Sequence, residues 1–119
     1  MERVGFITTE SDTDLIVSFA IPGEGLGEVT SITLIRTKYD CFLYPWEQGV
    51  SVSHEDFPDE DFDLLKSIEL DRRTVRITMQ RRKYALDIQD VDRDNIQRAA
   101  EILRRMNFDQ RFLLKLGPI

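Results

Sequence analysis

The chain has 119 residues, the length of one ordinary domain, and we expect residues 1–119 to fold as a single domain. Hydrophobic residues make up 41% of the sequence and charged residues 32%, which is typical of globular rather than disordered proteins. No apolar run approaches the ~18 residues that a membrane helix needs, so the sequence predicts no membrane span. The N-terminus lacks the pattern of a secretory signal and Cys41 is the only cysteine, which together favour a cytoplasmic protein.

The net charge of −6 is distributed unevenly along the chain. Residues 1–63 hold fourteen acids and three bases, whereas residues 64–119 hold eight acids and thirteen bases. The densest acidic run is EDFPDEDFD, and we expect an acidic surface loop at residues 54–63 because so many like charges repel one another. The asymmetry indicates either a charged partner or two halves of the chain that neutralise each other within the fold.

Residues 4–88 alternate repeatedly between apolar and polar positions, and this period of two predicts strands with one buried face. The predicted strands span residues 4–8, 15–21, 30–37, 42–46, 50–53, 67–70, 74–80 and 84–88. The last three are joined by linkers too short for a crossover, so we expect an antiparallel meander.

A helix is predicted after the meander. Asp92 is placed to cap its N-terminus, with Val91 and Ile96 in the positions of a hydrophobic staple. An apolar stripe with helical spacing follows, at Ile96, Ala99, Ala100, Leu103 and Met106. Asn107 is predicted to end the helix in the left-handed conformation, and a short strand or extended tail would then return apolar side chains to the core.

These elements predict an α+β fold: seven to eight mostly antiparallel strands forming a curved sheet or sandwich, with one long C-terminal helix that covers an open side. An exposed edge strand of such a sheet could pair with a second copy of the chain, so a homodimer is compatible with the pattern.

Candidate catalytic and metal-binding residues are few. His54 is the only histidine, and we interpret it as a solvated loop residue beside the acidic run. We interpret Cys41 as a buried thiol within a predicted strand. The alternate acids of residues 59–63 resemble the opening of a calcium loop, but the later glycine and glutamate are absent. We therefore expect no enzyme activity, no metal and no cofactor.

Two surfaces are candidates for binding. In the acidic run, carboxylates would attract a basic protein partner and phenylalanines would anchor it. The predicted contact residues are Asp56, Phe57, Asp59, Glu60, Asp61 and Phe62. The alternative is an anion-binding site on two basic turns, formed by Arg72, Arg73, Arg81, Arg82 and Lys83.

The alternative site has a structural rationale of its own. Seven strands followed by a C-terminal helix is also the layout of pleckstrin-homology-like modules, which would bind anionic lipid or phosphate through the basic turns. Nucleic-acid binding is opposed by the pI of about 4.8 and by acids placed to pair with these bases.

The order of several segments resembles a known family. A strand DTDLIVSFA, a strand ITLIR, a GVSV segment after an aromatic stretch, the run SIELDRRTVRITM and an acid-capped helix ending in ILRRM follow one another between Val4 and Met106. In this order they resemble the immunity protein 10 family of bacterial polymorphic toxin systems. The resemblance implies a cytoplasmic, non-enzymatic immunity protein that neutralises a cognate toxin by direct binding. A basic toxin fits the acidic run, because nucleases carry cationic sites for phosphate.

Overall fold

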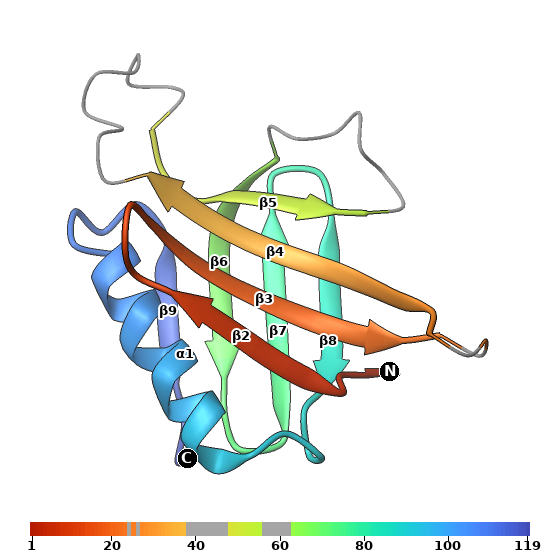
Figure 1. Ribbon diagram of the computed structural model, residues 1–119. Helices are drawn as coiled ribbons and strands as arrows, with labels where there is room; N and C mark the ends of the chain where they lie inside the picture. Colours follow the sequence, from red (N-terminus) through yellow and green to blue (C-terminus); the bar gives the residue numbers. More distant parts are fainter. Residues whose placement is uncertain (24, 26, 38–47, 56–62) are drawn as a thin grey trace.

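One nine-stranded sheet, folded into two layers, and one helix build the part of the chain that the structure describes (Figure 1). The computed structural model describes residues 1–23, 25, 27–37, 48–55 and 63–119. The elements are β1 (Glu2–Arg3), β2 (Phe6–Glu10), β3 (Asp14–Pro22), β4 (Val29–Thr37), β5 (Ser51–His54), β6 (Asp63–Leu70), β7 (Thr74–Met79), β8 (Lys83–Asp87), α1 (Arg93–Met106) and β9 (Leu113–Leu116). The fold is therefore α+β and mostly antiparallel, and its described residues form nine strands where seven or eight were predicted.

The sheet runs in the order β1-β8-β7-β6-β5-β4-β3-β2, and β9 pairs with β6. We call β2 to β5 the front layer and β6 to β9 with β1 the back layer, because β2, β3 and β4 cross in front of β6, β7 and β8 (Figure 1). β6 joins the layers, since its first residues pair with β5 and its second half pairs with β9. A register shift between Leu65 and Ser67 on β6 marks a bulge between these two parts.

The predicted meander is confirmed as β6, β7 and β8, which are antiparallel neighbours. The tail after the helix forms β9, which lies parallel to β6 with Leu113 opposite Ser67. β1 is also parallel to its neighbour, β8. The strand predicted at residues 42–46 lies outside the described residues, and so does Cys41 just before it.

Alternate residues of both layers point into a shared core. Val17, Phe19 and Leu34 of the front layer are fully buried, as are Ile68 and Ile77 of the back layer. α1 packs against β2 and β3 and closes one side of the core (Figure 1). Its buried residues are Ile96, Ala99, Ala100, Ile102, Leu103 and Met106, so the predicted apolar stripe is confirmed. Each buried aliphatic side chain contributes ~1.5–3 kcal/mol, so this core is the main source of stability.

The helix begins where predicted, but both of its ends differ from the prediction in detail. Asp92 is the N-cap residue, yet its side chain makes no capping hydrogen bond, and its carbonyl accepts from the Ile96 amide at 3.1 Å. The helix spans fourteen residues, shorter than the long helix predicted. Asn107 has φ −96°, so the left-handed prediction there is wrong, and Gln110 has the positive φ of 56° instead. Within the described residues, no helix is long and apolar enough to cross a membrane.

A buried arginine joins the front layer to the segment after α1. Arg36, near the end of β4, is only 2% exposed. Its guanidinium donates to both carboxylate oxygens of Asp109, at 2.7 and 2.8 Å, and to the Met106 carbonyl at 2.7 Å. The Phe108 ring covers it, with 4.3 Å between Cζ and the ring centroid. We call these four residues the Arg36 clamp.

The clamp also fixes the ionisation of its carboxylate. Hydrogen bonds from Arg36 hold the pKa of Asp109 far below its usual range, and a bond from Arg111 Nε at 2.7 Å adds to the effect. Because the folded pKa is lower than the unfolded one, the ionised clamp stabilises the fold fully above about pH 4. This contribution is lost as the pH falls toward the folded pKa.

Asp109→Asn should destabilise the protein by about 3 kcal/mol at pH 7, because it removes the carboxylate that pairs with the buried Arg36. Urea unfolding measures this difference, which should shrink as the pH falls below about 4, because the Asp109 carboxylate of the unfolded wild type then becomes protonated. Asp90→Asn is the matched control, since it breaks an exposed pair with Arg3 whose side chains are 60% and 66% exposed. The clamp's role is contradicted if both variants cost the same, or if the Asp109→Asn difference does not change with pH.

Candidate functional site

The basic residues predicted to form an anion site lie on two separate turns. Because β7 is antiparallel to both neighbours, the β6–β7 turn and the β7–β8 turn lie at opposite ends of it (Figure 1). Six strand residues separate the turns by ~20 Å. The first turn carries Arg72 and Arg73, and the second carries Arg81, Arg82 and Lys83. The structure therefore does not bring these five residues together.

Residues of the β6–β7 turn form hydrogen bonds within the turn and to the residue before the helix. Asp71 Oδ1 accepts hydrogen bonds from the backbone amides of Arg73 and Thr74, both at 2.8 Å. These bonds hold the pKa of Asp71 below its usual value, so the turn contains a fixed negative charge. Arg72 donates to the Val91 carbonyl at 3.2 Å, which ties the turn to the start of the helix. Arg72 and Arg73, the two cations of this turn, are thus poorly placed to hold an anion.

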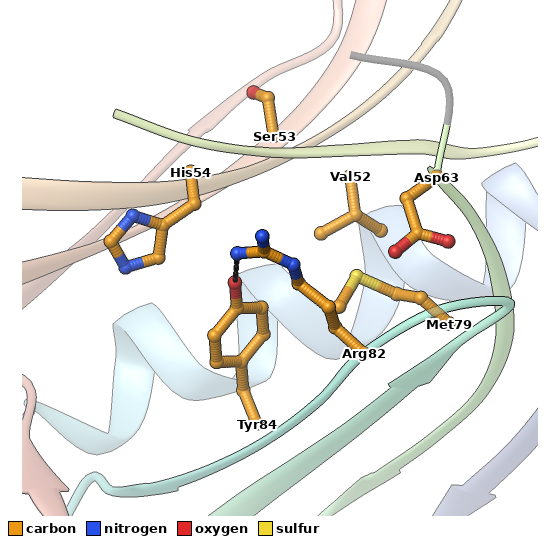
Figure 2. A pocket seen from close by; sticks show the side chains of 7 residues that line it. All are labelled: Val52, Ser53, His54, Asp63, Met79, Arg82 and Tyr84. Atoms are coloured by element: carbon orange, nitrogen blue, oxygen red, sulfur yellow. Dashed lines mark hydrogen bonds between the residues drawn. The ribbon is translucent and has the colours of Figure 1, made fainter. Parts of the chain in front are cut away.

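A small pocket lies between β5 and the β7–β8 turn (Figure 2). The space in it that the centre of a water molecule can occupy is about 10 Å³, close to the minimum for one water. The lining residues are Val52, Ser53, His54, Asp63, Met79, Arg82 and Tyr84. Asp63 lies at one end and His54, Arg82 and Tyr84 gather at the other, with Val52 and Met79 between them (Figure 2). The pocket is thus polar at both ends and apolar in the middle.

Asp63 is the least expected member of the pocket. The loop predicted at residues 54–63 would expose it, yet it begins β6 and is only 4% exposed. Its Oδ1 accepts from the Arg81 amide at 3.0 Å, but its Oδ2 has no hydrogen-bond partner in the described part of the chain. A buried carboxylate oxygen without a donor costs free energy, so this atom is where water or a ligand donor would bind.

His54 also differs from its prediction. It ends β5 instead of lying in a solvated loop, and its half-buried ring stacks on Tyr84 with 5.5 Å between centroids and 26° between planes. Tyr84 in turn accepts from Arg82 at 3.5 Å. The two end residues of the predicted loop, His54 and Asp63, are therefore strand residues instead.

The chemistry available to this pocket is limited. Its volume of about 10 Å³ is far below the ~300–1,000 Å³ that pockets for drug-sized ligands occupy. Among the described residues, no group of three His, Cys, Asp or Glu side chains is arranged to hold a metal ion. The pocket suits ordered water or one small donor group at Asp63.

The six predicted contact residues of the acidic run, from Asp56 to Phe62, lie outside the described residues. The structure does place both flanks of this run. Glu55 is exposed directly after β5, and its amide donates to the Ser31 carbonyl at 3.3 Å. Asp63 starts β6 and lines the pocket at the end opposite His54. The two described residues of the acidic run, Glu55 and Asp63, thus lie next to the pocket and within its lining.

Comparison of the sequence with protein families and characterised proteins, and of the fold with solved structures, gives no match.

Replacing Asp63 should reveal the cost of its unpartnered oxygen. Asp63→Asn keeps an acceptor for the Arg81 amide and removes the buried charge, so stability should be unchanged or rise by up to about 1 kcal/mol. Asp63→Ala removes the acceptor as well and should cost ~1–3 kcal/mol. Thermal and urea unfolding of both variants measure the two effects. Equal destabilisation by both substitutions would show that the charge itself is satisfied.

Proposed function

We propose that the protein is a non-enzymatic binding domain that recognises a basic protein partner through its acidic run, residues 55–63. The observation that carries the proposal is the position of this run, which begins next to and ends within the lining of a pocket with a buried, unpartnered carboxylate oxygen. Carboxylates concentrated in one short run of the sequence attract a cationic surface and accelerate its encounter with the protein.

The ion pairs between described residues support this proposal. Arg3 pairs with Asp87 at 3.7 Å and with Asp90 at 3.5 Å, and Arg36 pairs with Asp109 at 2.7 Å. Both are cations of the acidic half of the chain, and their partners are acids of the basic half. In these pairs, the two described cations of residues 1–63 neutralise acids of the other half of the chain rather than acids of their own half.

The proposed contact residues have two roles. Asp56, Asp59, Glu60 and Asp61 would steer the partner, and Phe57 and Phe62 would anchor it, because aromatic side chains supply much of the binding energy at interfaces. In its most specific form, the proposal is a cytoplasmic immunity protein that blocks a cognate basic toxin. That form rests on the resemblance of residues 4–106 to the immunity protein 10 family.

Charge reversal tests the contact residues. The triple variant Asp59→Lys, Glu60→Lys and Asp61→Lys should lower affinity for the basic partner at least ~100-fold, since each reversed contact is worth about 1 kcal/mol or more. The matched control reverses three exposed acids elsewhere, Asp12, Asp92 and Glu101, and gives the same net charge. Capture from a lysate of the source cells, with quantitative mass spectrometry, compares the three proteins.

The expected result is one basic protein that the wild type and the control both retain at low salt and release as salt rises. The triple variant should fail to retain it. Equal retention by the triple variant, or binding that salt does not weaken, contradicts the assignment.

The second candidate function is a module that binds anionic lipid or phosphate. The described residues form nine strands, and β9 follows α1, so the fold departs from the seven strands and C-terminal helix for which a pleckstrin-homology-like layout was predicted. The observation in favour of this candidate is the β7–β8 turn, where Arg81 and Lys83 are exposed on either side of Arg82. The site would then comprise Arg81, Arg82 and Lys83, since the other turn lies at the far end of β7.

Co-sedimentation with phosphatidylserine vesicles at low salt tests this candidate. If it is correct, the double variant Arg81→Glu, Lys83→Glu should lose binding, whereas Arg98→Glu, Arg104→Glu on the exposed face of α1 should retain it. Absence of wild-type binding removes the candidate.

A further inference from the structure

A hollow lies on the outer face of the back layer, over β6, β7 and β8. The space in it that the centre of a water molecule can occupy is about 400 Å³, within the ~300–1,000 Å³ of small-molecule sites. In Figure 1 this face is turned away from the viewer, because the front layer crosses before it. We call it the back hollow; the side chains that line it from outward strand positions are Ser67, Glu69, Arg76, Thr78, Lys83 and Ala85.

The strand registers explain why the face is hollowed here. Two rows of outward residues cross the three strands, Ser67–Thr78–Lys83 and Glu69–Arg76–Ala85. Serine, threonine and alanine are short, so the middle of the two rows is low and the long cationic side chains rise at its margin. Arg76 lies diagonally across from Lys83, about 7–8 Å away by the usual spacing of diagonal neighbours. Both cations can therefore reach a group seated over Thr78.

The polar groups of the back hollow are not used by the fold. Four of its side chains are hydrogen-bond donors that pair with no described residue: Ser67, Arg76, Thr78 and Lys83. Arg76 lies directly opposite Glu69, yet the two form no ion pair. Glu69 pairs instead with Lys115 on β9, with 3.6 Å between Oε1 and Nζ. The acid of the hollow thus has its ion pair outside the hollow.

Charge separates the back hollow from its neighbour on the same face. The adjoining hollow, over β6, β7 and β9, has a similar volume of about 450 Å³. Its described lining balances Glu69 and Asp71 against Arg76 and Lys115. The back hollow sets two cations, Arg76 and Lys83, against Glu69, which Lys115 already neutralises. A local positive excess on a chain with a net charge of −6 indicates an anionic ligand.

We propose that the back hollow binds the phosphate group of a phosphate monoester. Such a group has three strong acceptor oxygens and nearly two negative charges at pH 7. Guanidinium, ammonium and hydroxyl groups are the side-chain donors that bind phosphate oxygens in proteins. A carboxylate has fewer oxygens and half the charge, and it would leave part of this donor set without an acceptor. The volume left beside the phosphate accommodates the organic group that it carries.

This site is separate from both functions proposed above. It contains no residue of the acidic run, and it shares only Lys83 with the basic β7–β8 turn. Arg76 and Thr78 belong to the back hollow alone, whereas Arg81 belongs to the turn alone. Variants at these three positions therefore distinguish the two anion sites, and variants of the acidic run test neither of them.

Amide NMR of the labelled full chain, titrated at constant ionic strength with inorganic phosphate and with phenyl phosphate, tests the proposal. Shifts should concentrate at Thr78 and Lys83, with a Kd below about 10 mM. Arg76→Gln and Thr78→Val should each weaken binding at least ~10-fold, because each removes a hydrogen bond to a charged group.

Matched controls make the same chemical changes elsewhere. Arg98→Gln on the exposed face of α1 and Thr8→Val on exposed β2 should bind phosphate as the wild type does. Circular dichroism checks the fold of each variant, and Ser67→Ala replaces Thr78→Val if the latter does not fold.

The source of the phosphate group is a second arm of the experiment. Vesicles containing phosphatidic acid present the same monoester group on a lipid, and phenyl phosphate presents it on a soluble molecule. Binding to either one supports the site if Arg76→Gln weakens it, and the tighter of the two identifies the source.

Three results would overturn the proposal. The first is an absence of shifts up to about 50 mM phosphate or phenyl phosphate together with no binding to the vesicles. The second is binding that Arg76→Gln leaves unchanged and Arg81→Gln abolishes, which would assign the anion to the β7–β8 turn. The third is acetate binding as tight as phosphate binding, which would show that the hollow does not select the phosphate group.

Discussion

The buried guanidinium of Arg36 is the interaction on which the arrangement of this protein depends. A cation this deep in the core needs a counter-charge and acceptors, and Asp109 with the Met106 carbonyl supplies them. Because Asp109 follows α1, the clamp fixes the end of the helix against the end of β4. The same carboxylate accepts from Nε of Arg111. A second nitrogen of that guanidinium donates to the side chain of Gln48, just before β5, at 2.6 Å. This series of hydrogen-bonded side chains therefore positions the helix, the segment before β9 and the start of β5, which lines the pocket.

Local patterns allowed the strands and the helix to be predicted, whereas the contacts that organise them are non-local. The meander and the apolar stripe of α1 follow from spacing within a few residues, which is why both are confirmed. The parallel pairings of β1 and β9 join residues far apart in the sequence, and no local pattern indicates them. Arg36 follows Ile32 and Leu34 at an inward position, but its partner is 73 residues away. Asn107 fits a left-handed helix end by residue type, yet its side chain accepts from the Phe112 amide, and the chain reverses later.

The binding surfaces show the same division between composition and geometry. The density of acids correctly indicates an acidic run, but it conceals that Asp63 is an inward strand residue whose hydrogen-bond donor lies on another turn. The five basic residues are close in sequence, and only the length of β7 separates them into two turns.

Binding at the acidic run is the central claim, and amide NMR of the labelled chain during titration with a short lysine-rich peptide tests it most directly. The account predicts that shifts concentrate at residues 54–63 and at the pocket residues Arg82 and Tyr84, and that they disappear at high salt because the attraction is electrostatic. Shifts that instead gather at other acids, such as Asp92 and Asp94 at the start of α1, or spread evenly over the surface, would contradict it.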